Sequence, residues 1–201
     1  MYNNLMDTSN LFGLIAGIAI LIGYVLYFKQ VIQNKSTPNP SSWAIWLLTG
    51  IIKSITYFSI TNHNIWQSLP GILDTFFVLC IFIYSLFKGR FSRISKTEVL
   101  TFSLAVIIGI FWQITSDDRI SNLLIQSIFI IAFVPTINGI LKGYAKENIN
   151  AWITVFASCL FLLISVGIGP NIDWVAFVSP IIGLLGNGLI MGSIIYKKSK
   201  K

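Results

Sequence analysis

The chain has 201 residues, of which 55% are hydrophobic and only 10% are charged. Its mean hydropathy is +0.78. A soluble domain carries roughly 25% charged residues, so this composition excludes an ordinary soluble protein and predicts a polytopic membrane protein. Lipid offers the backbone no hydrogen bonds, and the spans are therefore expected to be helices.

Seven apolar segments approach the ~20 residues that a helix needs to cross the bilayer. In chain order, the sequence predicts spans at 11–29, 41–61, 66–87, 98–115, 120–141, 150–168 and 174–196. The connections between them are short, which leaves no room for an extramembrane catalytic module. The first ten residues lack the basic region of a cleaved signal peptide, so the first span is expected to stay in the mature protein.

The basic residues predict the orientation of these spans. Of 14 lysines and arginines, all but Lys53 and Arg119 lie in the C-terminal tail or near the connections after the first, third and fifth spans. Lysine and arginine accumulate on the cytoplasmic side of membrane proteins. The N-terminus is therefore expected outside and the C-terminus in the cytoplasm. The net charge of +7 reflects this topology rather than a nucleic-acid partner.

Two opposite charges interrupt the second and third spans. Trp46, Gly50, Lys53 and Tyr57 recur at spacings of four, three and four residues, which places them on one helical face. Asp74 lies in the next, inward-running helix at a similar depth. A charged residue at the centre of a membrane helix costs about 2.5–3.5 kcal/mol, so we expect Lys53 and Asp74 to form an ion pair. Three roles stay open: docking the two helices, lining a solute or proton pathway, or snorkelling towards the lipid surface.

An internal repeat relates the two ends of the chain. Residues 39–43 align with residues 148–152, and each segment runs from asparagine to tryptophan. The next tryptophan follows after 23 residues in the first copy (43 to 66) and after 22 in the second (152 to 174). These spacings predict two copies of a three-helix unit.

The repeat divides the chain into three parts within one membrane domain. They are a first three-helix unit at 1–90, a linker helix at 91–118 and a second unit at 119–201. Each unit has an odd number of spans, so one extra span is needed to give both units the same orientation. This arrangement, 3+1+3, is that of parallel repeats related by an axis along the membrane normal.

A 3+1+3 arrangement with an external N-terminus resembles the SWEET and PQ-loop superfamily of sugar, amino-acid and vitamin carriers. At the inner end of the first helix of each copy, Tyr27-Phe28-Lys29-Gln30 keeps the glutamine of the Pro-Gln motif. The matching Phe133-Val134-Pro135-Thr136 keeps the proline. Residues 38–46 and 134–136 are also similar to a group of small bacterial membrane proteins of unassigned role. The resemblance implies a carrier in the bacterial cytoplasmic membrane.

SWEET-like carriers use an asparagine from the third helix of each bundle to hold the hydroxyl groups of the solute. By this resemblance Asn187, within Gly186-Asn187-Gly188, matches the second copy, and Asp74 is the polar candidate in the first. A carboxylate there suits an amine-bearing or cationic solute, or proton coupling. A hydrogen bond that only packs helices is the alternative role for Asn187. The predicted substrate-binding residues are Trp46, Lys53, Tyr57, Asp74, Gln126 and Asn187.

Three prolines fall inside predicted spans, where each removes a backbone hydrogen bond and favours a kink. Pro70, Pro135 and Pro180 are therefore candidate hinges for alternating access, with static kinks as the alternative. The single histidine, His63, has no partner ligands nearby in sequence, so no metal site and no cofactor are expected. Cys80 and Cys159 lie in apolar spans and are interpreted as packing residues.

Enzyme classes find no support in the sequence, because it has no phosphate-binding glycine loop, no His/Cys ligand spacing and no Ser-His-Asp set. Two function classes stay open. The first is a carrier for a small polar solute, by alternating access and with proton coupling as an option. The second is a non-transporting scaffold or receptor-like protein. The expected partners are a small solute and the lipid bilayer, with no nucleic acid; self-association stays open.

Overall fold

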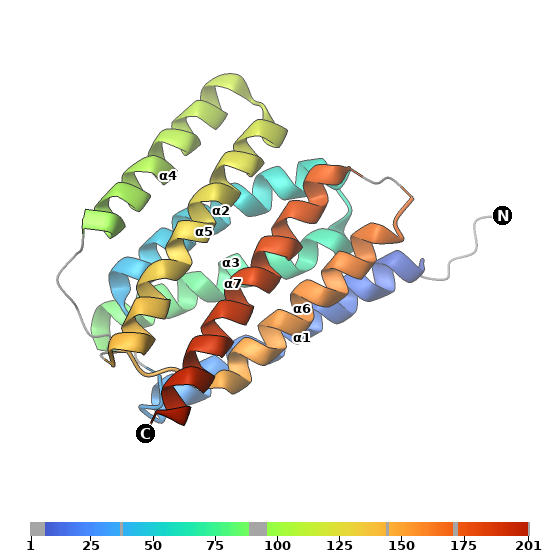
Figure 1. The fold of residues 1–201 in the computed structure, drawn as a ribbon. Coiled ribbons are helices and arrows are strands. Elements are labelled where there is room, and N and C mark those ends of the chain that lie inside the picture. Colours follow the sequence, from blue (N-terminus) through green and yellow to red (C-terminus); the bar gives the residue numbers. More distant parts are fainter. Residues whose placement is uncertain (1–6, 37, 89–95, 144, 171–172, 201) are drawn as a thin grey trace.

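The computed structural model describes residues 7–36, 38–88, 96–143, 145–170 and 173–200. These residues form seven α-helices, and no strand occurs among them (Figure 1). The helices are α1 (Thr8–Ile32), α2 (Pro40–Ile60), α3 (Ile65–Lys88), α4 (Lys96–Thr115), α5 (Asp118–Lys142), α6 (Ile149–Gly167) and α7 (Trp174–Ser199). The boundary predicted between residues 90 and 91 lies outside the described residues, as do Arg90, Arg93 and Lys201.

All seven helices are long and apolar enough to cross a membrane. The seven predicted spans are confirmed, with ends that differ by a few residues. Large aliphatic side chains cover the outside of the bundle, where Val25, Ile107 and Leu185 are 57%, 59% and 64% exposed. Lipid suits such a surface and water does not, so the chain is an integral membrane protein.

Polar residues just before the helices determine where several of them begin. The Asn39 side chain accepts a hydrogen bond from the Ser41 backbone N–H, and Pro40 occupies the first helical position of α2. The Asn148 side chain accepts from the Asn150 backbone N–H in the same way at the start of α6. Such caps satisfy donors that a helix start leaves free. The asparagines that open the two copies of the sequence repeat therefore have the same structural role.

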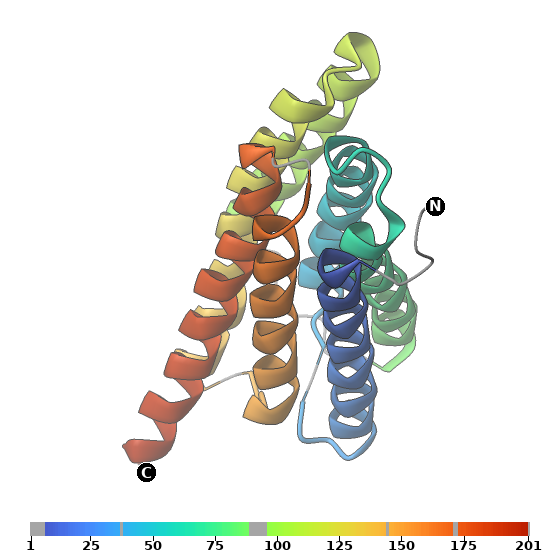
Figure 2. The same cartoon turned by 90° about the vertical axis from the view of Figure 1, so that its right-hand side faces the viewer.

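Each helix packs against particular neighbours. Helix α3 packs against both α1 and α2, and α7 packs against both α5 and α6. Between these groups α1 packs along α6, and α2 packs along α5; the first pairing is visible as neighbouring ribbons in Figure 2. Helix α4 packs against α5 and α2.

Glycines allow two of these packings to be close. A Cβ atom on Gly13 of α1 would lie 2.5 Å from the backbone oxygen of Trp66 in α3. A Cβ atom on Gly186 of α7 would overlap the ring of Phe133 in α5. Because small residues let membrane helices approach closely, these two positions determine how near α1 lies to α3 and α7 to α5.

The three prolines predicted inside spans lie inside helices. Pro70 is within α3, Pro135 within α5 and Pro180 within α7, and each helix continues past its proline. The two third-position helices, α3 and α7, thus both carry a proline near their start. The hinge role stays a prediction.

Candidate functional site

The predicted ion pair joins α2 to α3. Lys53 Nζ lies 3.4 Å from Asp74 Oδ2, which confirms the contact expected from their equal depth. Their side chains are only 11% and 19% exposed. Both charges therefore face the interior of the bundle, and the snorkelling alternative is wrong.

Two aromatic residues complete the surroundings of this pair. The Tyr24 hydroxyl of α1 donates a hydrogen bond of 2.6 Å to the other carboxylate oxygen of Asp74. The Lys53 ammonium lies 4.4 Å from the ring centroid of Phe129 in α5, a cation–π contact. Side chains from four helices thus meet around this ion pair.

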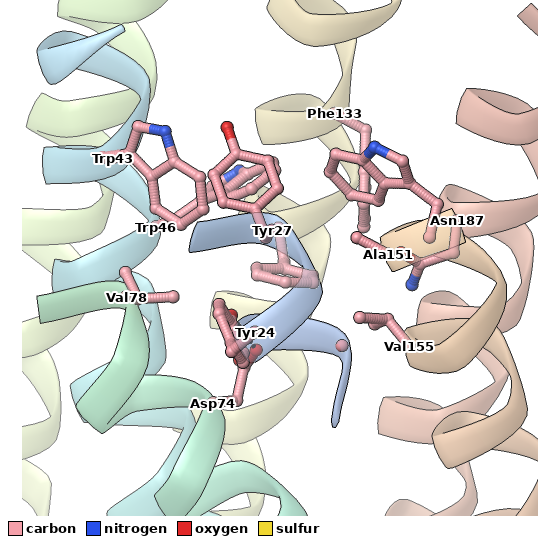
Figure 3. Close-up of a pocket in the computed structure, with 13 residues that line it drawn as sticks. Tyr24, Tyr27, Trp43, Trp46, Asp74, Val78, Phe133, Ala151, Val155 and Asn187 are labelled. Carbon is pink, nitrogen blue, oxygen red and sulfur yellow. Dashed lines mark hydrogen bonds between the residues drawn. The ribbon is translucent and has the colours of Figure 1, made fainter. Parts of the chain in front are cut away.

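A cavity of about 60 Å³ opens beside Asp74 (Figure 3). Its walls are mainly aromatic, and its polar side chains come from α1, α2, α3, α6 and α7. The lining residues are Gly23, Tyr24, Tyr27, Trp43, Trp46, Asp74, Val78, Phe129, Phe133, Ala151, Trp152, Val155 and Asn187. They belong to α1, α2, α3, α5, α6 and α7, and none belongs to α4.

One end of the cavity is a cluster of aromatic rings. The centroids of Tyr27 and Trp43 are 5.3 Å apart, and Trp46 lies 5.0 Å from Trp43 and 6.1 Å from Trp152. The Trp46 indole N–H donates to the backbone oxygen of Ala132 in α5 at 3.3 Å, so its polar atom is satisfied. In Figure 3 Tyr27, Trp43 and Trp46 lie at one end and Tyr24 with Asp74 at the other.

Asn187 lies on the far side of the cavity from Asp74 (Figure 3). The side chain is 4% exposed, and its Nδ2 donates a hydrogen bond of 2.7 Å to the Gly183 carbonyl one turn earlier in α7. This bond occupies only one of its two amide hydrogens. The remaining capacity of Asn187 is available to a molecule in the cavity.

The six predicted site residues separate into three groups. Trp46, Asp74 and Asn187 line the cavity, and Lys53 reaches it through its contact with Asp74. The remaining two residues, Tyr57 and Gln126, do not line it.

Tyr57 serves a contact between helices. Its hydroxyl donates a hydrogen bond of 3.1 Å to the Ala176 carbonyl of α7. The residue lies one turn beyond Lys53 in α2, and it packs in an apolar cluster with Val175 and Leu162. The helical face predicted from spacing is continuous, but the turn that carries Tyr57 meets α7 rather than the cavity.

Gln126 is buried in the bundle, with 1% of its surface exposed. Neither atom of its amide has a hydrogen-bond partner. One turn earlier in α5, Asn122 donates to Thr56 Oγ1 at 2.9 Å, while its Oδ1 is also without a partner. A buried polar group without a partner costs about 1–3 kcal/mol, so these amides lower the stability of the folded protein.

Sequence reasoning missed the contribution of α1. Tyr24 and Tyr27 line the cavity from a span whose only charged residue, Lys29, lies in its last turn, so no charge inside the span pointed to it. Two tyrosines three residues apart in an otherwise aliphatic stretch were the available signal, because a buried hydroxyl needs a polar partner.

Within the described part of the chain, no group of three or more histidine, cysteine, aspartate or glutamate side chains could hold a metal ion. Comparisons with family models, with curated proteins and with solved structures find no match. The chemistry of the cavity is therefore the basis for a functional conclusion. Aromatic rings can stack on a flat or cationic group, and Asp74 and Asn187 can accept or donate hydrogen bonds.

Proposed function

We propose that the protein is a membrane carrier for a small polar solute, working by alternating access of two three-helix bundles. The observation that carries the proposal is the composition of the cavity wall. It draws residues from α1, α2, α3, α5, α6 and α7, and none from α4. A site shared by two bundles is where a carrier that rocks one bundle against the other would bind its solute.

The packing of the helices supports a 3+1+3 arrangement of parallel repeats. If α1, α2 and α3 are exchanged with α5, α6 and α7, the contacts of α3 with α1 and α2 become those of α7 with α5 and α6. The contact of α1 with α6 becomes that of α5 with α2. Helix α4 alone lies outside this exchange, as a linker would. The distribution of basic residues supports an external N-terminus. The resemblance to small bacterial membrane proteins is the basis for proposing a bacterial cytoplasmic membrane.

The side chains around the cavity favour a solute that carries an amine or hydroxyl group. Asp74 offers a carboxylate at one end, Asn187 offers an amide across from it, and the aromatic rings offer stacking surfaces. The resemblance to SWEET-like carriers supports the use of residues 74 and 187 in this way. Coupling of transport to protons is the accompanying option, with Asp74 as the carboxyl at the cavity.

The size of the cavity indicates which state of such a carrier the structure represents. Pockets for drug-sized ligands measure about 300–1,000 Å³, whereas this cavity measures about 60 Å³. A sugar or amino acid would enter only after the bundles move apart, so the state is closed around its centre. Pro70 and Pro180 in the two third-position helices, with Pro135 in α5, are the candidate hinges for that movement.

Uptake into proteoliposomes tests the proposal, with labelled glucose, lysine, choline and thiamine as probes. A carrier should concentrate or equilibrate at least one of them faster than empty vesicles. The Lys53→Met/Asp74→Asn double variant removes both charges together and should insert normally but lose that uptake. Full uptake by the well-expressed double variant would remove the pair from the mechanism.

A non-transporting scaffold or receptor-like protein is the second candidate, and the small volume of the cavity favours it. A scaffold has no need for a central space and should stay packed there in every state. If no probe enters the vesicles and no probe alters the stability of the protein, the scaffold becomes the better account.

A further inference from the structure

One carboxylate connects two loops that lie far apart in the sequence. Glu147, in the connection between α5 and α6, accepts a hydrogen bond at Oε2 from Trp152 Nε1 at 3.2 Å. The same oxygen lies 3.3 Å from Ser36 Oγ, in the connection between α1 and α2. Ser36 is 1% exposed. A single oxygen atom thus joins a loop of the first three-helix group to a loop of the second.

This contact covers the aromatic end of the cavity. Trp152 and Tyr27 both line the cavity, and Trp152 donates a hydrogen bond to the Glu147 carboxyl. The rings of Tyr27 and Trp152 are 6.5 Å apart in an edge-on arrangement. Any movement of Glu147 away from Trp152 would loosen the rings that close this end.

The contact favours the protonated carboxyl. Burial raises the pKa of Glu147 from 4.5 to about 8, against the opposing effect of hydrogen bonds from Trp152, Ser36 and Tyr27. The titratable group that faces it from α1 is Tyr27, and Trp152 of α6 does not titrate. Lys35 and Lys146, the basic residues next to the two ends of the contact, point into solvent as exposed side chains.

The hydrogen-bond geometry at Ser36 also favours the protonated form of Glu147. The Ser36 hydroxyl also lies 3.4 Å from the Gln30 side-chain oxygen, and one hydroxyl hydrogen cannot serve two acceptors fully. A protonated Glu147 resolves this, because its O–H donates to Ser36 Oγ while the Ser36 hydroxyl donates to Gln30. Removal of the proton leaves two acceptors competing for one hydrogen.

We propose that Glu147 is a proton-operated latch on the loop end of the cavity. With its proton, the carboxyl holds the two loops together through Ser36 and holds the indole of Trp152 in the aromatic cluster. When the proton leaves for solvent water, the partly buried anion is costly, so the carboxylate moves into water and the loops part. The latch deepens the proposed carrier function. It rests on that function in one respect only, namely that the opened end of the cavity would admit a solute.

The distance between the two loops tests the latch without any need for transport. Spin labels on Lys35→Cys and Lys146→Cys, in a background with Cys80→Ala and Cys159→Ala, would report that distance by pulsed electron resonance. Spectra of the purified full-length protein are recorded from pH 6 to pH 9.5. We expect one short distance at pH 6 and a second, longer distance that replaces it as pH rises. If one proton controls the change, the ratio of the long-distance population to the short-distance population should change by about tenfold per pH unit near the midpoint of the transition.

Two variants identify the group responsible. Glu147→Gln cannot ionise and keeps both a donor for Ser36 and an acceptor for Trp152, so it should stay at the short distance at every pH. Glu98→Gln is the matched control, because Glu98 is a buried carboxylate that accepts a hydrogen bond from Asn39 in the loop between α1 and α2. This variant should behave like the parent.

The outcomes decide between the latch and its alternatives. A distance that is the same at all pH values in the parent protein overturns the latch, as does an equal pH response in Glu147→Gln. A response that disappears in Glu98→Gln instead places the sensor elsewhere and also overturns it. Failure of the proposed transport would show in the uptake assay alone, since the loop distance is measured without a solute.

Discussion

Separate and joint removal of the Lys53–Asp74 charges should have very different effects on stability. Lys53→Met leaves the Asp74 carboxylate with only the Tyr24 hydroxyl, and Asp74→Asn leaves the Lys53 ammonium with only the ring of Phe129. Removing one member of a buried pair costs about 3–5 kcal/mol, while replacing both members with uncharged groups is often close to neutral. The low exposure of both side chains, 11% and 19%, means that both charges are largely removed from water.

These magnitudes translate into thermal shifts that are easy to measure. A protein of this length loses about 2–4 °C per kcal/mol, so each single variant should melt about 6–20 °C below the parent in detergent. The double variant should melt within about 2 kcal/mol of the parent, that is, within roughly 8 °C. The double-mutant cycle then gives a coupling energy of at least about 4 kcal/mol between the residues. A double variant as unstable as the sum of the two single variants would refute the buried-pair argument.

Three further predictions concern other parts of the bundle. Gly13→Ala should destabilise the protein by about 1–3 kcal/mol, because its Cβ would lie 2.5 Å from the backbone of α3. Gly192→Ala is the control: its Cβ would have nothing within 4 Å, and it should be neutral or stabilising in the same melting assay. Gln126→Met should raise the melting temperature, since the amide has no partner, while Gln67→Met should lower it by removing hydrogen bonds to α1 and α6. The pKa of Glu147 is raised from 4.5 to about 8, so between these pH values the folded protein binds a proton that the unfolded chain does not. The free energy of unfolding should therefore fall as pH rises from about 4.5 to about 8. Glu147→Gln should remove the part of this fall that comes from Glu147.

The spans were predictable because lipid imposes one requirement on every segment. A helix that must satisfy its own backbone and face hydrocarbon needs about 20 apolar residues, and runs of that length are visible in the printed sequence. The Lys53–Asp74 contact was predictable for a related reason. Each charge is too costly to leave alone in the bilayer. Because a short connection joins the two helices and the two residues lie at similar depth, each charge has few other partners.

The composition of the cavity wall was less predictable, because it depends on which face of each helix turns inward. Tyr57 continues the helical face of Lys53, yet its hydroxyl meets the α7 backbone instead of the cavity. Gln126 was expected at the cavity for its polarity alone, and it is buried elsewhere without a partner. Nothing in the sequence distinguishes Glu147 from other loop carboxylates, since its burial arises from a contact with Ser36 more than a hundred residues away.

The melting temperature of the purified protein against a panel of sugars, amino acids, vitamins and amines tests the central claim most directly. A molecule that binds only the folded state must raise the melting temperature by mass action. At a concentration one hundred times its dissociation constant, it adds about 2.7 kcal/mol to the free energy of unfolding. The proposed carrier requires at least one such compound, and its effect should be lost in Asp74→Asn. A stable protein whose melting temperature responds to none of them, at any pH from 6 to 9, would contradict a central solute site and favour the scaffold.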